Sequence, residues 1–96
     1  MKRADQKIAK AAELLKTIAN STRLKILLAL AQTDALNVSY LQQQLQIEQS
    51  VLSHALIQMK DRDILARQRR GKEIYYSLAD PAALKMILWA MNRVEG

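Results

Sequence analysis

The 96-residue sequence predicts a mainly α-helical domain that carries one small β-hairpin. It contains two glycines and one proline, so its helical stretches run almost uninterrupted. Residues 38–45 and 49–62 have the apolar spacing of short helices and are separated by a brief turn, as in a helix-turn-helix. Residues 64–69 and 73–78 then alternate like two strands around Gly71, which suits a tight turn. We therefore expect one winged helix-turn-helix domain over residues 1–96, with the order α-α-α-α-β-β-α.

The charge of the chain favours a polyanionic partner. Fifteen lysines and arginines against nine acidic residues give a formal net charge of +6. Much of this excess lies between residues 60 and 72, where the helix of residues 49–62 ends and the hairpin turns. A concentrated positive surface on a small domain indicates nucleic acid as the binding partner. A solvated charged surface without a partner is the alternative interpretation.

The composition excludes several chemistries. The chain has no cysteine, so disulfides and thiolate metal sites are ruled out. No apolar run approaches the roughly 20 residues that a membrane-spanning helix needs. We expect a cytoplasmic protein without membrane attachment. Because a chain of this length buries little of its own surface, a second subunit is also expected to contribute to its stability.

Apolar spacing predicts the first two helices. The first has one stripe at intervals of three and four residues, made by Ile8, Ala11, Ala12, Leu15, Ile18 and Ala19. Asn20 or Ser21 then accepts the free amide hydrogens of a second helix, which extends to about Gln32. Its predicted inner face consists of Leu24, Leu27, Leu28 and Ala31. Arg23 is expected at the surface or on a phosphate, and residues 33–37 form a polar connection.

The helix of residues 49–62 is the predicted base-reading element. One face carries the apolar residues Leu52, Ala55, Leu56 and Met59, and the opposite face carries Ser50, Ser53, His54 and Ile57. Polar side chains can hydrogen-bond base edges, and an aliphatic group can touch a thymine methyl. Merely solvent-facing residues would form the same pattern. The candidate DNA-binding residues, including the cations of the hairpin, are Gln49, Ser50, Ser53, His54, Ile57, Lys60, Arg67, Arg69, Arg70 and Lys72.

The last helix predicts a dimer. It begins after Asp80 with Pro81 at its first position and extends to about Arg93. Its inward stripe is Leu84, Ile87, Leu88 and Met91, yet Met86, Trp89, Ala90 and Val94 are apolar as well. A helix that is apolar around most of its circumference needs cover on two sides. We expect a second copy to supply it, with contacts from both terminal helices at Ile8, Leu15, Leu84, Ile87, Leu88, Trp89 and Met91.

Such a dimer would present two reading helices to successive major grooves, about 34 Å apart. We would look for an apolar ligand between the first and last helices, near Met86, Trp89 and Met91. A stripe of methionine and tryptophan is more often core or interface than a ligand site.

Three segments resemble the ArsR-type winged-helix repressors, a family named for arsenical resistance. Residues 20–27, Asn-Ser-Thr-Arg-Leu-Lys-Ile-Leu, resemble the family's second-helix opening, with Ser21 where proline is usual. Residues 49–56, Gln-Ser-Val-Leu-Ser-His-Ala-Leu, resemble its recognition helix. Residues 69–78, Arg-Arg-Gly-Lys-Glu-Ile-Tyr-Tyr-Ser-Leu, resemble its wing. The similarity covers almost the whole chain, and the three segments occur in the family's order and spacing.

The resemblance implies a homodimeric repressor that binds an inverted-repeat operator and releases it when an inducer binds. In many members the inducer is a metal ion, but the metal-site positions differ here. The thiolate pair of the third helix would fall at Asn37 and Ser39. The site on the last helix begins with Asp-x-His, but two residues after Asp80 this chain has Ala82. His54 is the only histidine, whereas a transition-metal site needs several nitrogen or sulfur ligands. We therefore expect no metal site and no cofactor, and the inducer is unidentified.

Two other classes of function compete with DNA binding. An enzyme is disfavoured, because the chain has no cysteine, one histidine and no glycine-rich phosphate loop. A winged-helix domain that docks proteins as an adaptor is the stronger alternative, since this fold also serves as an interaction module. The net positive charge and the polar face of the helix at residues 49–62 argue for DNA instead.

Overall fold

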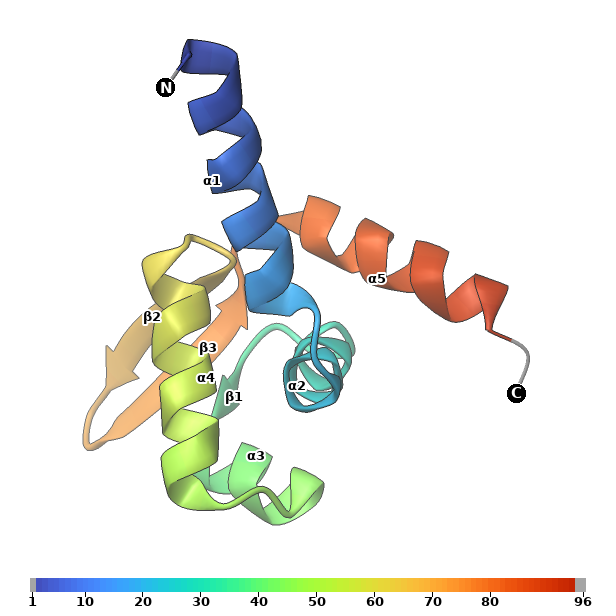
Figure 1. Ribbon diagram of the computed structural model, residues 1–96. Helices are drawn as coiled ribbons and strands as arrows, with labels where there is room; N and C mark the ends of the chain where they lie inside the picture. Colours follow the sequence, from blue (N-terminus) through green and yellow to red (C-terminus); the bar gives the residue numbers. More distant parts are fainter. Residues whose placement is uncertain (1, 95–96) are drawn as a thin grey trace.

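The computed structural model describes residues 2–94, which form five helices and a three-stranded antiparallel sheet (Figure 1). The predicted winged helix-turn-helix is confirmed, with one additional strand. The elements in chain order are α1 Arg3–Ile18, α2 Ser21–Leu30, β1 Leu36–Asn37, α3 Val38–Leu45, α4 Gln49–Asp61, β2 Leu65–Arg70, β3 Glu73–Leu78 and α5 Pro81–Arg93. Within the described range, no helix combines the length and the apolar character needed to cross a membrane.

The sheet has the order β1-β3-β2, so the hairpin formed by β2 and β3 is extended by the short strand β1. Leu36 pairs with Tyr76, and Asn37 pairs with Tyr75. The prediction of a simple polar connection over residues 33–37 was therefore incomplete. A strand of two residues is too short to show the alternation from which strands are recognised.

The hairpin turns at Gly71, as predicted. Arg70 pairs with Glu73 across the turn, which leaves Gly71 and Lys72 as a two-residue loop. Gly71 has φ +64°, and no other residue of the loop has a positive φ, the pattern of a type II′ turn. An added Cβ at Gly71 would meet no atom within 4 Å. The need for glycine therefore comes from the backbone angle and not from a lack of space.

The core lies between α2, α3, α4 and the sheet. Its fully buried large side chains are Ile26, Leu27, Leu30, Leu41, Leu52, Leu56 and Met59. The predicted inner face of α2 was partly wrong, because Ile26 and Leu30 are buried whereas Leu24 and Leu28 are only half-buried. Helix α2 contacts α3 and β3 as well as α5, so it is covered from several directions. Its apolar spacing alone does not say which direction buries it most.

Side-chain caps begin three of the helices. The Oδ1 atom of Asn20 accepts the Arg23 N–H at 2.9 Å, so Asn20 rather than Ser21 caps α2. Asn37 caps α3 in the same way, accepting the Tyr40 N–H at 2.7 Å. Asp80 accepts the Ala82 N–H at 2.9 Å, with Pro81 as the first residue of α5, as predicted.

Two helices of the DNA-binding half end on left-handed residues that are not glycine. Gln46 ends α3 with φ 53° and ψ 44°. After α4, Asp63 has φ 60°, and the N–H groups of Asp63 and Ile64 donate to the carbonyls of Lys60 and Met59 at 3.0 and 2.9 Å. These bonds form a Schellman motif. The left-handed angle is unfavourable for a side chain with a Cβ, so both ends are strained.

Replacing Gln46 with glycine is therefore expected to stabilise the protein. The strain that is relieved exceeds the added entropy of the unfolded chain, for a net gain of about 0.5–1 kcal/mol. This corresponds to a rise in Tm of roughly 2–8 °C by calorimetry. Gln44→Gly, in the last turn of α3, is the control and should lower Tm by a similar amount. Equal destabilisation by both variants would contradict the strain at Gln46.

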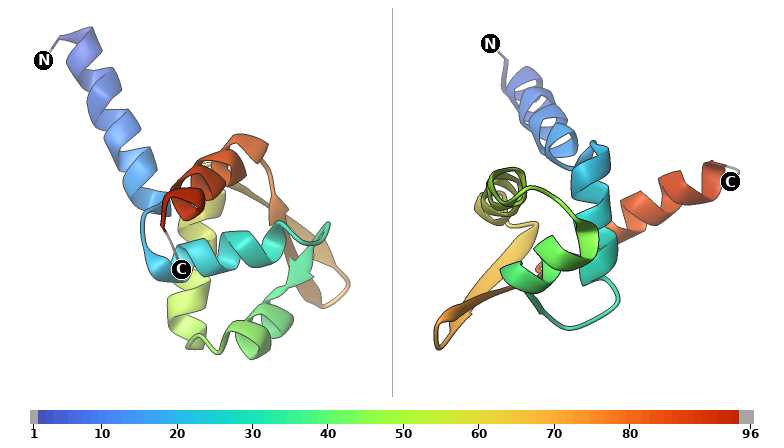
Figure 2. Two further views of the ribbon diagram at one scale, coloured as in Figure 1. Left: turned by 90° about the vertical axis from the view of Figure 1, so that its right-hand side faces the viewer. Right: turned by 90° about the horizontal axis from the view of Figure 1, so that it is seen from below.

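Helices α1 and α5 leave the body in diverging directions (Figures 1 and 2). Of the stripe predicted on α1, only Ile18 is buried, and Ile8 and Leu15 are 67% and 49% exposed. On α5, Ile87 is buried, but Leu88 and Met91 are 44% and 50% exposed. The inward stripe predicted on α5 was thus only partly correct within one protomer, because Ile87 is buried and Leu84 half-buried whereas Leu88 and Met91 are exposed. Each helix extends past the body, so the outer half of its apolar stripe has nothing to pack against.

Candidate nucleic-acid interface

Helix α4 is amphipathic as predicted, with its apolar side in the core and a polar face outside. Leu52, Ala55, Leu56 and Met59 are at most 3% exposed. On the opposite side, Ser50, His54 and Ile57 are exposed and Ser53 is half-buried. We call these four residues the reading face. It combines hydroxyl and imidazole groups with the side chain of Ile57, which is 48% exposed, on one rigid helix.

An acidic residue adjoins the start of the reading face. The Ser50 hydroxyl donates to the Glu48 carboxylate at 2.8 Å, just before α4 begins. Gln49, the first residue of the helix, is exposed beside them. Sequence reasoning did not include Glu48 among the site residues. This contact holds the Ser50 side chain in one orientation, and a base-edge contact by Ser50 would have to replace it.

Lys60 lies apart from the reading face. It is ten residues beyond Ser50, which places it about 15 Å further along α4 at a rise of 1.5 Å per residue. Its ammonium group lies 3.7 Å from the carboxylate of Asp61, and both side chains are exposed. An exposed pair of this kind contributes little to stability. At the carboxyl end of α4, Lys60 is therefore placed for a contact with a DNA phosphate at most, and not with a base.

The β2–β3 hairpin, which we call the wing, carries the predicted cations. Arg67, Arg69, Arg70 and Lys72 are all exposed. The Nε atom of Arg69 donates to the Gly71 carbonyl at 3.0 Å, and Arg70 Nη2 donates to Gln68 Oε1 at 3.2 Å. The Arg70 guanidinium also lies 4.6 Å from the centre of the Tyr75 ring, a cation–π distance. Two arginines are thus held in defined orientations near the tip.

The wing tip and the amino-terminal half of α4 lie toward the same end of the molecule (Figure 1). A recognition helix contacts bases mainly through its amino-terminal residues, while cations beside it hold phosphates. The reading face and Arg69, Arg70 and Lys72 are therefore arranged so that one duplex could meet both. This arrangement suits a helix that reads bases and a hairpin that contacts phosphates.

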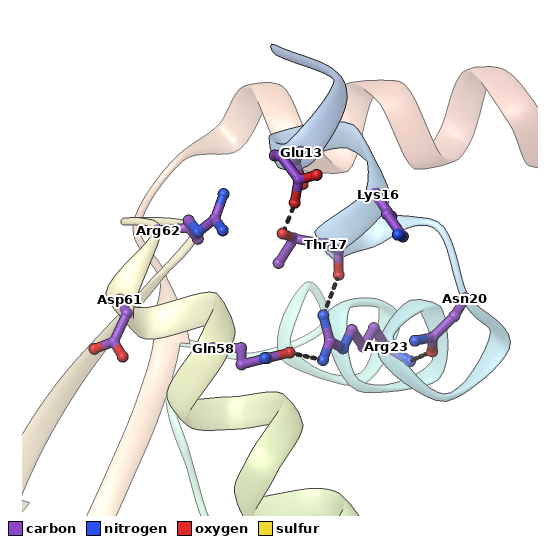
Figure 3. A pocket seen from close by; sticks show the side chains of 8 residues that line it. All are labelled: Glu13, Lys16, Thr17, Asn20, Arg23, Gln58, Asp61 and Arg62. Atoms are coloured by element: carbon purple, nitrogen blue, oxygen red, sulfur yellow. Dashed lines mark hydrogen bonds between the residues drawn. The ribbon is translucent and has the colours of Figure 1, made fainter. Parts of the chain in front are cut away.

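Arg23 has a role that sequence reasoning missed. Its Nη1 atom donates to the Thr17 carbonyl of α1 at 2.9 Å, and Nη2 donates to the Gln58 side chain of α4 (Figure 3). Arg23 is half-buried and lies outside the core, as expected, but its guanidinium is engaged within the protomer. Arg23 joins the end of α1 to the recognition helix. It borders an open polar cavity of about 480 Å³ lined by Glu13, Lys16, Thr17, Asn20, Arg23, Gln58, Asp61 and Arg62.

The predicted dimer residues occupy different environments. Ile8, Leu15, Leu88, Trp89 and Met91 are exposed, and Leu84 is half-buried. Ile87 is only 2% exposed and belongs to the protomer's own core, so it has no surface left for a partner. Trp89 lies beneath the Arg93 guanidinium, whose carbon is 4.5 Å from the ring.

The place considered for an apolar ligand, between the first and last helices, coincides only in part with a crevice. A crevice of about 190 Å³ does lie between α1 and the start of α5, and Met86 lines it together with Leu14, Leu15 and Ile18. Trp89 and Met91 do not line this crevice, because they follow on the part of α5 that leaves the body.

Comparison with known proteins gives consistent matches along the chain. The family model for the amino-terminal domain of the methanogenesis regulatory protein FilR1 matches residues 12–79. The chain is 47% identical over 84 residues to the transcriptional repressor PagR of Bacillus anthracis, covering 88% of this chain and 83% of PagR. It is 34% identical over 83 residues to the biofilm growth-associated repressor of Agrobacterium fabrum, covering 86% of this chain and 70% of that protein.

Solved structures agree with this match. The crystal structure of NolR from Sinorhizobium fredii superposes with a TM-score of 0.83 at 28% identity, covering 100% of this chain and 95% of NolR. These relatives are transcriptional regulators, a class of protein distinct from enzymes. Sequence, fold and surface chemistry thus lead to one assignment. The chain belongs to the ArsR-type family of winged helix-turn-helix proteins, and it is a DNA-binding transcriptional repressor.

Proposed function

We propose that this repressor binds an inverted-repeat operator as a homodimer that pairs through α1 and α5. The exposed apolar side chains on these helices support the pairing, because a soluble protomer rarely leaves such a surface uncovered. They include Ile8, Leu15, Leu88 and Met91, each at least 44% exposed. A two-fold pair would set two reading faces on one side of a duplex. Inverted-repeat half-sites about one helical turn apart match that geometry.

In this proposal the two parts of the interface have different tasks. The reading face, with Gln49 beside it, contacts base edges and discriminates sequences. Arg67, Arg69, Arg70, Lys72 and Lys60 contact phosphates and strengthen binding to any DNA. The observation that carries the proposal is the exposed Ser50–His54–Ile57 surface, which faces away from the core on the helix beside the cationic wing.

We further propose that the signal to which the repressor responds is not a metal ion bound by this chain. The sequence offers one histidine and no cysteine, and His54 lies on the exposed reading face. A transition-metal site needs several nitrogen or sulfur ligands within one coordination sphere. An inducer of another chemical class would have to act on the position of α4 or on the dimer.

The division of tasks predicts two different mutant phenotypes. His54→Ala should weaken binding to the operator by about 1–3 kcal/mol and leave binding to random DNA nearly unchanged. Arg69→Gln with Arg70→Gln should weaken both kinds of DNA by a similar factor. It should also reduce the slope of log K against log salt concentration by roughly 3–4, because a dimer loses four cations. Fluorescence polarisation across a salt series measures both effects.

The outcomes also separate DNA binding from an adaptor role. A protein-docking adaptor would show no steep salt dependence and no preference for its own promoter region. Equal losses on operator and random DNA in His54→Ala would mean that the base-reading surface lies elsewhere. Lys25→Gln, which removes a charge from an exposed residue of α2, is the control for a general effect of net charge.

A further inference from the structure

One acidic residue lies among the cations of the wing. Glu73 is the only carboxylate between residues 64 and 79, and it is exposed at the start of β3, directly after the turn. A negative charge in a hairpin that approaches phosphates is repelled by them, so on electrostatic grounds alone it weakens DNA binding. The contacts that Glu73 makes indicate what it contributes instead.

The Glu73 carboxylate accepts two hydrogen bonds from different parts of the fold. Its Oε2 atom lies 3.0 Å from Asn37 Nδ2 and 3.2 Å from the Tyr75 hydroxyl. The other end of the Asn37 side chain accepts the Tyr40 N–H at 2.7 Å and so caps α3. One asparagine therefore joins the wing to the first helix of the helix-turn-helix. Hydrogen bonds to an ionised acceptor are stronger than neutral ones.

The same carboxylate also acts on the wing's own cation. Tyr75 donates its hydroxyl to Glu73 and presents its ring to the Arg70 guanidinium, whose carbon is 4.6 Å from the ring centre. Fixing the hydroxyl limits sideways displacement of the ring on which Arg70 rests. The contacts thus run from α3 through Asn37 and Glu73 to Tyr75, and from there to an arginine near the tip.

We infer that Glu73 is a positioning residue that sets the orientation of the wing relative to the helix-turn-helix. The inference rests on the proposed function, because it matters only if wing and reading face engage one duplex together. Beyond the residues that pair with β1, Tyr75 and Tyr76, the wing is only two-stranded and has little rigidity of its own. Its outer part here is tied to the body through Glu73, so that Arg69 and Arg70 meet phosphates while the reading face meets bases. The repulsion from one carboxylate is outweighed by this alignment.

Two substitutions at Glu73 separate alignment from charge. Glu73→Gln removes the charge but keeps an oxygen that can accept from Asn37 and Tyr75. Glu73→Ala removes both. We expect Glu73→Ala to bind its operator about five- to tenfold more weakly while binding random DNA at least as well as wild type. Glu73→Gln should bind operator as tightly as wild type or more tightly. The ratio of operator to random affinity is the readout, because a general loss of folded protein would lower both together.

The two donors provide a second, independent test. Tyr75→Phe removes only the hydroxyl, and Asn37→Ser removes the amide donor while keeping a side chain that caps helices well. Each should lower the operator-to-random ratio in the wild-type background. Neither should lower it further in the Glu73→Ala background, because the shared acceptor is already gone. If the effects of Glu73→Ala and of either donor substitution add fully in these double-mutant cycles, the inference is overturned.

The operator probe is the duplex that the wild-type dimer selects from genomic fragments, and calorimetry confirms that each variant is folded. If Glu73→Ala and Glu73→Gln tighten binding to both DNAs equally, Glu73 acts through its charge alone and the inference fails. Equal losses in both variants would also overturn it. If wild-type protein shows no preference for any duplex, the proposed function itself fails, and that result is obtained before any variant is compared.

Discussion

Leu88→Glu is expected to convert the proposed dimer into monomers at micromolar concentration. Leu88 is 44% exposed in the protomer, so the substitution leaves the protomer core intact. In a two-fold interface it would place two unpaired carboxylates on a surface that must be desolvated, which costs several kcal/mol. Because each half-site is then bound separately, operator affinity should fall by about 100-fold or more. Analytical ultracentrifugation and fluorescence polarisation measure the two effects.

A second site and a control define this prediction. Ile8→Glu places the same change on α1, where Ile8 is 67% exposed and contributes little to the protomer. It should also dissociate the dimer. Gln6→Glu introduces a carboxylate on the opposite side of the same helix and should leave the dimer intact. A monodisperse dimer in both the Leu88 and the Ile8 variants would contradict pairing through α1 and α5.

Arg23→Ala is expected to cost about 2–3 kcal/mol of unfolding free energy, because the charged donor serves two partners. One is the Thr17 carbonyl, among the last carbonyls of α1, and the other is the Gln58 side chain on α4. Without Arg23 the helix end loses a cation that complements its dipole. The expected fall in Tm is roughly 8–24 °C, measured by calorimetry at a fixed protein concentration.

The geometry of Arg23 provides the control. Arg23→Lys keeps the charge but offers a single ammonium group that cannot span both partners, so it should recover only part of the loss. Lys25→Ala, two residues further along α2 and exposed, should change Tm by little. A fall in Tm as large in Lys25→Ala as in Arg23→Ala would show that the Arg23 contacts contribute nothing special.

Local signals in the sequence account for much of the fold. Asn20 and Asp80 lie where helices begin because their side chains accept free amide hydrogens, and both caps are present. Gly71 marks the hairpin because the turn needs a positive φ. Each of these features depends on residues that are neighbours in the chain. The order of the helices and the hairpin was therefore predictable, and so were the helix limits to within a residue or two.

Features that depend on distant packing were not predictable. The strand Leu36–Asn37 exists because β3 offers it an edge, and two residues alone carry no alternation. Apolar spacing located the stripes on α1 and α5, but it could not tell which part of each stripe lies against the body. Leu88 and Met91 were expected inside the protomer for this reason, and they are exposed.

The candidate site divides in the same way. The reading face follows from the helical repeat of α4, and the wing cations follow from their position at the turn. Arg23 and Glu73 carry no such local signal. Their partners Gln58 and Asn37 are 35 and 36 residues away in the chain, so only the folded arrangement brings each pair together.

The most direct test of the central claim is to sequence the DNA that the purified protein selects from random genomic fragments. The account predicts an enriched inverted repeat whose half-sites lie about 10 base pairs apart from centre to centre, or a multiple of that spacing. Selection of an unrepeated half-site, or of no common sequence at all, would contradict a dimer that reads two grooves.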